Sequence, residues 1–305
     1  MTAKQVRVYS PGSIANLGPG FDVIGVALDS IGDIIRLERI DEPEVRLSIM
    51  GVGADRIPLD PEVNSSGAVL QLIKERYGVP HGFSAEIRKG VPPGKGMGSS
   101  GASASATAVA VNHLLGLGLG LKDLIELAAH GEAAVAGAPH ADNVAASIMG
   151  GYVLVGDDYD VVRLDAPSIG VVVAVPDIDI ENKTRRARML LPESVTLRDA
   201  VRNIGYASRM TAGVALGDAV LFGMSICDNL VEPYRASMIP RFWEVKQAAL
   251  DAGAYGCSIS GGGPSIFAVG ERVGEIAEAM VDAFSTVKTR VYHTAPSNRG
   301  ARVIS

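Results

Sequence analysis

Short apolar or alternating runs mark the predicted strands of the first half of the chain, and longer segments with apolar residues three or four positions apart mark its helices. The predicted strands are residues 6–10, 34–40, 45–50, 83–89 and 152–156. The predicted helices are residues 64–77, 121–136 and 142–149, with another that begins at Ser99 or Ser100 and ends in the glycines of 116–120. Pro11-Gly12 is expected to end the first strand, because proline lacks an amide donor, and Gly78 to end the first helix.

The second half has a different order of elements. A strand at 170–175 precedes helices at 196–217, 218–229 and 240–252, a hairpin of 258–260 and 265–269 around the turn 261–264, a helix at 272–284 and a strand at 288–293. This order is typical of an α+β sandwich with helices on one face of the sheet. We therefore predict an α+β protein of two domains, 1–155 and 156–305, because 305 residues suffice for two hydrophobic cores.

Charge and cysteine content exclude several classes of protein. The chain has 28 Lys and Arg against 34 Asp and Glu, a net charge of −6. It therefore lacks the excess of basic residues that is typical of a nucleic-acid-binding protein. Cys227 and Cys257 are too few for a disulfide framework or a zinc site, so we expect free thiols in a cytoplasmic protein. The first residues contain no apolar signal region. The uncharged stretch 96–121 is interrupted by serines and glycines, and it predicts a buried helix rather than a membrane span.

Glycine is in clear excess, with 36 copies among 305 residues, about 12% against an average of about 7%. One cluster, Gly94-Lys-Gly-Met-Gly-Ser-Ser-Gly101, joins a predicted strand to a predicted helix. Alternating glycines let backbone amides converge without obstruction by Cβ atoms, and a helix N-terminus adds unpaired donors and a partial positive charge. The segment therefore predicts a phosphate-binding loop.

The loop matches neither common nucleotide-binding motif in context. Gly96-x-Gly98-x-x-Gly101 fits the dinucleotide pattern, but Pro92-Pro93 separates it from the strand and no acidic residue follows at the required distance. The Walker pattern fails because Lys95 is followed by glycine. A tight turn before a buried helix would account for one or two glycines, but not for two prolines, three alternating glycines and paired serines together.

Glu132 lies on an unexpected side of its predicted helix. With Leu124 at zero on a wheel of 100° per residue, Val135, Ala128 and Gly131 fall within about 40° and Glu132 at about 80°, among the apolar positions. A carboxylate directed toward a core needs a partner charge or a metal. Together with Ser99 or Ser100 it fits a Mg²⁺ site, which takes one or two carboxylates, a hydroxyl and phosphate oxygens. A buried ion pair or a carboxylate at the helix edge fits the wheel equally well.

Three segments together resemble the GHMP small-molecule kinases. They are Pro11-Gly-Ser-Ile-Ala-Asn-Leu-Gly-Pro-Gly-Phe-Asp22, the loop from Pro92 to Ala102, and Ser260-Gly-Gly-Gly-Pro-Ser265, in that family's order. Within the family, the first segment and the stretches 139–143, 184–188 and 232–235 resemble the homoserine kinase branch. The resemblance implies a two-domain architecture, with a ribosomal-protein-like α/β domain that contains a left-handed phosphate-loop unit, and a ferredoxin-like C-terminal sandwich.

The same resemblance implies which residues bind ATP and a metal. The residues assigned to ATP are Asn64 in the nucleoside pocket and Pro92, Pro93, Gly94, Lys95, Gly96, Met97, Gly98, Ser99, Ser100, Gly101 and Ala102 around the phosphates. Ser100 and Glu132 would hold Mg²⁺.

It also implies a site for homoserine, the zwitterionic amino acid with a terminal hydroxyl. The implied contacts are Asn16, Asp22, His140, Asn143, Thr184, Arg188 and Arg235, and Asp22, His140 and Arg188 are the candidate catalytic residues. The forked guanidinium groups of Arg188 and Arg235 suit the substrate carboxylate, and Asp22 suits its ammonium group. Taken singly, His140 would more often be a structural histidine, Arg235 part of a surface ion pair, and Asp22 a cap or turn residue, and only the motif context favours a site.

Mevalonate- and galactokinase-like members carry a lysine or arginine near the position of Ser13, and this chain has none. We therefore expect direct attack by the substrate hydroxyl on the γ-phosphorus of ATP, without a dedicated base. Another alcohol of the shikimate or mevalonate type is the alternative substrate, and a non-catalytic nucleotide-binding protein is the alternative class, although such a protein would not need Glu132. A dehydrogenase is disfavoured by Pro92-Pro93. A homodimer is expected from the resemblance alone.

Overall fold

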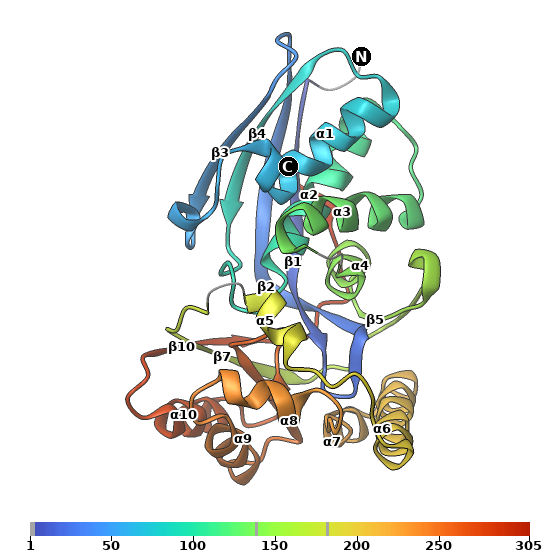
Figure 1. Cartoon of the computed structure of the whole chain (residues 1–305). Helices are drawn as coiled ribbons and strands as arrows, with labels where there is room; N and C mark the ends of the chain where they lie inside the picture. The colour runs from blue at the N-terminus through green and yellow to red at the C-terminus, as the bar shows by residue number, and fades with distance from the viewer. Residues whose placement is uncertain (1–3, 138–139, 181–182) are drawn as a thin grey trace.

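The computed structural model describes residues 4–137, 140–180 and 183–305. The chain forms two lobes, each built from one sheet and the helices that cover it (Figure 1). The first lobe contains a seven-stranded sheet and the second a four-stranded sheet. This α+β architecture is the one that the element order predicted.

The sheet of the first lobe is mixed. Its strands are β1 (Gln5–Asn16), β2 (Gly20–Ile40), β3 (Val45–Gly51), β4 (Gly82–Lys89), β5 (Tyr152–Val155), β6 (Val161–Leu164) and β11 (Arg302–Val303). The order is β11-β1-β2-β4-β3, and β5 pairs with the first part of β2 and with β6. Strands β3 and β4 are parallel, and the other pairs are antiparallel. Strand β4 therefore lies between β2 and β3, although β3 comes directly after β2 in the chain.

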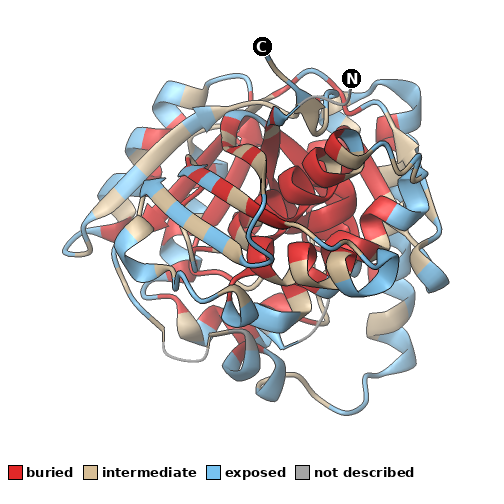
Figure 2. Ribbon diagram, turned by 90° about the horizontal axis from the view of Figure 1, so that it is seen from above, coloured by how far each residue is buried: buried red, intermediate tan, exposed pale blue. Residues whose placement is uncertain are grey.

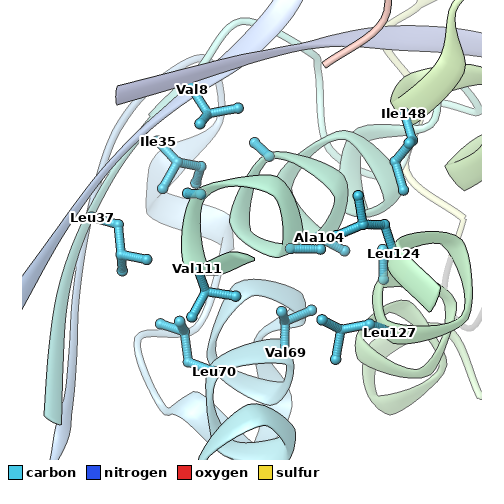
Figure 3. Packing of buried hydrophobic residues seen from close by; sticks show 14 of the residues in the cluster. Val8, Ile35, Leu37, Val69, Leu70, Ala104, Val111, Leu124, Leu127 and Ile148 are labelled. Carbon is cyan, nitrogen blue, oxygen red and sulfur yellow. The ribbon is translucent and has the colours of Figure 1, made fainter. Parts of the chain in front are cut away.

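Helices α1 (Ser65–Tyr77), α2 (Ser99–Leu115) and α4 (Ala141–Met149) pack against this sheet, and α3 (Leu121–Ala136) packs on these helices. Figure 3 shows the apolar cluster between sheet and helices, with Ile35 and Leu37 of the sheet directed toward the helices, and Val69 of α1 beside Leu127 of α3. Helix α2 is buried along most of its length, and Figure 2 shows the buried residues gathered at the centre of the molecule. The absence of charge in this helix follows from that position. No helix in the described part of the chain has the length and apolar character that crossing a membrane requires.

The second lobe has the ferredoxin-like order of strands. Its strands are β7 (Gly170–Pro176), β8 (Gly256–Ile259), β9 (Ile266–Gly270) and β10 (Thr289–Thr294). They pair antiparallel in the order β10-β7-β9-β8, with helices between the first and second strands and between the third and fourth. The helices are α5 (Lys183–Met189), α6 (Leu197–Leu216), α7 (Ala219–Met224), α8 (Glu232–Arg235), α9 (Phe242–Asp251) and α10 (Val273–Phe284).

Most predicted elements are confirmed within a few residues, but two predictions are wrong. Strand β1 does not end at Pro11-Gly12: it continues to Asn16 through a shift of register between Pro11 and Ser13, because a bulge accommodates a proline inside a sheet. The predicted helix 218–229 stops at Met224, because Asp228 accepts hydrogen bonds from the amides of Leu230, Val231 and Glu232 and so begins the next short helix, α8, instead of continuing this one. Sequence patterns missed the first part of β2 and the short elements β6, α5 and α8.

The second predicted domain contributes two strands to the sheet of the first lobe. Strand β6 follows residue 155 yet pairs with β5, and β11 returns from the end of the chain to pair with β1. One of the apolar clusters contains Ile14 and Ile24 from the first lobe together with Val173 and Phe222 from the second. The division into 1–155 and 156–305 stays a prediction, and this shared cluster fixes the two lobes around the cleft described next.

Candidate active site

A cleft of about 300 Å³ opens between the lobes. Segments far apart in the sequence line it: the end of β1, the loop before α2, the helices α3 and α5, and the turn between β8 and β9. Figure 1 shows α5 at this junction, between the upper and the lower lobe. The cleft therefore gathers residues from both halves of the chain.

The glycine loop lies along this cleft and needs its glycines for two reasons. Gly94, Gly96 and Gly98 have φ values of 72°, 81° and 66°, in the left-handed region that side chains disfavour. A Cβ atom on Gly96 would lie 2.3 Å from the carbonyl oxygen of Ser260, and one on Gly98 2.1 Å from the Ser13 hydroxyl. The loop ends at Ser99, where α2 begins with its free amide groups, as a phosphate-binding loop requires.

A buried ion pair between Lys89 and Asp33 anchors the glycine loop to the sheet of the first lobe. The ammonium of Lys89 bonds to the carboxylate of Asp33, to the Ser103 hydroxyl (2.7 Å) and to the Ser99 carbonyl (2.9 Å). The other oxygen of Asp33 accepts hydrogen bonds from the amides of Gly90 and Val91. Both charged side chains are almost completely buried. The pair thus ties β2 and β4 to the entry of the loop and to α2.

The turn between β8 and β9, in the second lobe, also holds the glycine loop. The Ser260 hydroxyl donates to the Gly96 carbonyl over 2.7 Å, and the amide of Ser265 donates to the Lys95 carbonyl over 3.3 Å. The side chain of Lys95 turns away from the loop and donates to the Ile178 carbonyl (2.6 Å) and to Asp179 (3.3 Å). Residues from the second lobe therefore help to fix the loop conformation.

Glu132 is buried, as the helical wheel predicted, with 3% of its surface exposed. The Ser100 hydroxyl donates a hydrogen bond of 2.8 Å to Oε1, and Nδ1 of His140 lies 3.6 Å from the same oxygen. The other oxygen, Oε2, is buried without a hydrogen-bond partner among the described residues. An unpartnered buried carboxylate oxygen beside a hydroxyl and a helix N-terminus fits a Mg²⁺ ion that is shared with phosphate oxygens. Within the described part of the chain, no group of three or more Asp, Glu, His or Cys side chains could hold a metal without such help.

His140 and Asp142 extend the charged part of the cleft. Burial lowers the pKa of His140, but its contact with Glu132 outweighs this effect, so that the pKa is raised overall. Burial raises the pKa of Asp142 to about 6, with the charge of His140 acting against it. Asn143 accepts a hydrogen bond from the Ser13 hydroxyl over 2.8 Å. All three side chains line the cleft.

The predicted substrate residues Asn16, Asp22, Arg188 and Arg235 also meet there. The Asn16 amide donates to the Gly261 carbonyl (3.0 Å) and accepts from the backbone N–H of Asp22 (3.1 Å). Asp22 Oδ2 lies 3.0 Å from Nη2 of Arg188. Asn16 and Asp22 both have positive φ values, 71° and 56°, and such strained backbone is concentrated at functional sites.

Arg235 is held from three sides. Its Nε donates to the Ala187 carbonyl (3.2 Å) and its Nη1 to the Gly261 carbonyl (3.4 Å). The Phe21 ring lies 4.9 Å from its Cζ atom and 5.9 Å from that of Arg188. Burial lowers the pKa of Arg235, and the nearby Asp22 acts against this effect. The two guanidinium groups therefore share one aromatic platform beside Asp22.

Some predicted residues have other positions. Asn64 borders the cleft, but its side chain caps α1 by accepting from the amides of Ser66 and Gly67. Met97 and Ala102 are buried in the cluster between the lobes, and Met97 contributes its carbonyl to the Ser13 amide. The side chain of Thr184, and Pro139, lie outside the described residues.

Sequence patterns missed five residues of the site: Phe21, Asp33, Lys89, Asp142 and Lys183. Phe21 and Asp142 stand beside residues of the predicted motifs, and that proximity is the signal that could have found them. Lys183 directly precedes the segment 184–188 and carries the same signal. Asp33 and Lys89 carry no comparable signal, because their role depends on contacts between distant segments.

Comparison with known proteins supports the same interpretation. Residues 64–151 match the family profile of the GHMP kinases N terminal domain, and residues 212–286 that of the GHMP kinases C terminal. The homoserine kinase of Methanocella arvoryzae is 41% identical over 98% of this chain and 97% of its own length. That of Natronomonas pharaonis is 43% identical, over 98% and 99%.

Solved structures agree with these relatives. The crystal structure of homoserine kinase from Cytophaga hutchinsonii superposes with a TM-score of 0.91 at 39% identity, covering 100% of this chain and 98% of that one. Mevalonate kinase from L. major, in complex with R-mevalonate, superposes with a TM-score of 0.75 at 16% identity over 98% and 97% of the chains, which shows a common fold alone.

Proposed function

The chain belongs to the homoserine kinases of the GHMP kinase family, and we propose that it transfers the γ-phosphoryl group of ATP to the side-chain hydroxyl of L-homoserine. The product is O-phospho-L-homoserine, an intermediate on the way to threonine. One observation carries the proposal: a phosphate-binding loop with the buried Ser100–Glu132 pair opens into the same cleft as Asp22, Arg188 and Arg235. ATP and an amino acid can thus meet there.

The substrate end of the cleft suits a small zwitterion. Arg188 and Arg235 offer two planar guanidinium groups to a carboxylate, and Asp22 and Asp142 offer negative charge to an ammonium group. Asn16, Asn143 and His140 line the same cleft and add hydrogen-bonding groups. The two asparagine side chains are neutral, and His140 is neutral or positively charged depending on pH. An alcohol of the mevalonate or shikimate type has a carboxylate but no ammonium, so it would offer no positive charge to Asp22 and Asp142.

The phosphate end supplies positioning and electrostatic stabilisation. Amides of the loop and of the first turn of α2 would hold the phosphate oxygens. Ser100 and Glu132 would hold Mg²⁺, which when bound neutralises charge on the phosphates. Asn64 and the neighbouring Ile57 and Pro58 border the part of the cleft where the nucleoside would lie.

We propose direct transfer without a dedicated base. The homoserine oxygen forms a bond to the γ-phosphorus while the bond from that phosphorus to the ADP oxygen breaks, and the hydroxyl proton passes late to a phosphate oxygen. Asp22 is engaged with Arg188, and His140 with Glu132, which supports this assignment. Asp22→Asn and His140→Gln test it: each should retain more than about a tenth of kcat. A fall of more than about 1000-fold with homoserine binding intact would identify a base and reject direct transfer.

The substrate is tested by measuring ADP release with MgATP and homoserine, shikimate, mevalonate or galactose. We expect homoserine to give a kcat/KM at least about 100-fold above the others, because only homoserine matches both charge sets. No release with homoserine would reject the proposal. Nucleotide binding without release for any alcohol would favour a non-catalytic nucleotide-binding protein.

We also propose a cytoplasmic homodimer. Cys227 and Cys257 are free, as in reducing compartments. Leu197, Val201 and Ile204 follow one another by a turn along α6 and are exposed, while Met210 of the same helix is buried. An exposed aliphatic stripe can pair with its own copy about a two-fold axis. Light scattering should give twice the mass of the chain, Ile204→Glu should give a monomer, and Met50→Glu on the exposed face of β3 should leave the dimer intact. A monomeric parent protein would reject the dimer.

A further inference from the structure

Lys183 is the first residue of α5, and its positively charged side chain lines the cleft. Its ammonium donates a hydrogen bond of 2.9 Å to the Gly263 carbonyl, and a Cβ atom on Gly262 would lie 3.8 Å from the same nitrogen. The Gly263 carbonyl also packs on the phosphate loop, since a Cβ on Gly96 would lie 2.8 Å from its oxygen. The oxygen that accepts from Lys183 therefore lies close to Gly96 of the phosphate loop.

The charges around Lys183 are mostly of its own sign. Arg235 and Lys95 are close enough to lower its pKa further after burial has done so, to about 8, and Glu132 acts in the opposite direction. Among the described residues, its hydrogen-bond partner is a neutral carbonyl rather than a carboxylate. A desolvated cation between other cations is stabilised when an anion enters. The site thus favours a highly charged anion next to Gly96.

We propose that Lys183 is a catalytic residue that contacts the γ-phosphoryl group during its transfer. This inference rests on the proposed kinase function. The transferred group carries charge on three equatorial oxygens while the bond to ADP breaks and the bond to the homoserine oxygen forms. Lys183 lines the same cleft as the loop that would hold the β-phosphate and the arginine pair that would hold the amino acid. The ammonium stays protonated throughout, and the hydroxyl proton goes to a phosphate oxygen.

If Lys183 had a purely structural role, Lys183→Met would lower the stability of the protein. The catalytic role predicts otherwise. Removing a half-buried cation that has no carboxylate partner among the described residues relieves a desolvation cost, so Lys183→Met should be at least as stable as the parent enzyme. If Lys183 contacts the γ-phosphate, its removal should weaken the binding of ATP but not the binding of ADP, which lacks that phosphate. The contact also depends on positive charge, so Lys183→Arg should recover part of the lost activity.

The experiment compares full-length Lys183→Met, Lys183→Arg and the control Arg186→Met, which changes an exposed cation of the same short helix. Turnover with homoserine, affinity for ADP, affinity for a non-hydrolysable ATP analogue and the melting temperature are measured for each. For Lys183→Met we expect kcat to fall about 100-fold, the effect of removing one preorganised group, and binding of the analogue to weaken about tenfold. ADP affinity should stay within about twofold of the parent value, and Lys183→Arg should recover at least about a tenth of kcat.

Three results would overturn the assignment. They are a kcat within about threefold of the parent value, an equal loss of ADP and analogue binding, or no recovery in Lys183→Arg. A parent enzyme that does not phosphorylate homoserine would instead reject the proposed function. In that case the difference between ADP and analogue affinity still tests the γ-phosphate contact of Lys183.

Discussion

The hydroxyl of Ser100 lies 2.8 Å from Oε1 of Glu132, at the point where α2 begins and α3 passes behind it. This hydrogen bond occupies one carboxylate oxygen and leaves the other buried without a partner in the described part of the chain. A carboxylate in this state is unfavourable in the unliganded protein. We infer that the fold keeps Glu132 oriented for a cation that arrives with the nucleotide.

Glu132→Gln tests this interpretation. The amide keeps the shape and the hydrogen bond from Ser100 but removes the charge, so we expect kcat to fall about 1000-fold and the dependence of the rate on Mg²⁺ concentration to weaken. Stability in urea should not decrease, because a buried charge is removed. Glu126→Gln is the control, since Glu126 lies on the same helix in a surface pair with Arg76 worth at most about 1 kcal/mol. Unchanged Mg²⁺ dependence in Glu132→Gln would contradict the metal assignment.

The buried pair of Lys89 and Asp33 should matter for folding rather than for chemistry. Lys89→Met leaves the Asp33 carboxylate buried without its cation, and we expect the free energy of unfolding to drop by about 3–5 kcal/mol. Adding Asp33→Asn removes the unpaired charge, so the double variant should recover at least half of that loss. Urea denaturation of the two variants measures both values. A double variant no more stable than Lys89→Met would show that the Asp33 charge is not the source of the cost.

Asp22 and Arg188 are about 40% exposed in their pair, so the pair itself should add at most about 1 kcal/mol to stability. Their effect should appear in substrate binding. We expect Asp22→Asn and Arg188→Met each to raise KM for homoserine about 10- to 100-fold, and the double variant to raise it by less than the product of the two, since both residues hold one zwitterion. Arg185→Met, an exposed neighbour on α5, is the control. Strictly multiplicative effects would indicate two independent roles.

Local sequence carries the parts of this molecule that depend on backbone conformation and helical periodicity. The glycine loop, the start of α2 and the burial of Glu132 follow from residue types at fixed spacing, and the structure confirms all three positions. The wheel was wrong for Val135, which it put on the core side. Val135 is 48% exposed because this end of α3 borders the open cleft and not the core.

Residues that act across the cleft were beyond prediction from local patterns. Lys183 bonds to Gly263 in the turn between β8 and β9, and this turn reaches the phosphate loop of the other lobe through Ser260. Lys89 meets Asp33 because β4 pairs with β2 in one particular register, in which Ile34 lies opposite Arg88. Such contacts depend on strand order and lobe packing, and a single sequence does not encode them in any short window.

The pH dependence of stability should carry the signature of Asp142. Burial raises its pKa from 3.8 to about 6 in the folded protein, so between about pH 4 and pH 6 the folded state binds more protons than the unfolded state. The contribution of this group to stability therefore falls as pH rises through that window, by up to about 3 kcal/mol at 1.36 kcal/mol per pKa unit. Asp142→Asn removes the effect. The free energy of unfolding of the variant minus that of the parent should be near zero at pH 4, rise to pH 6 and then stay level.

Urea unfolding at pH 4, 5, 6 and 7 measures this difference. Glu278→Gln on the exposed face of α10 serves as the control, and its difference from the parent should stay within about 0.5 kcal/mol across the series. A difference for Asp142→Asn that is flat with pH would show that the carboxyl is already ionised at pH 4, and that His140 and the amide of Asn143 offset its burial. A rise across the window instead means that Asp142 carries a cost in the free enzyme which an incoming ammonium group relieves. The free enzyme would then keep a substrate site that lowers its own stability, and binding of the substrate ammonium group would remove that cost.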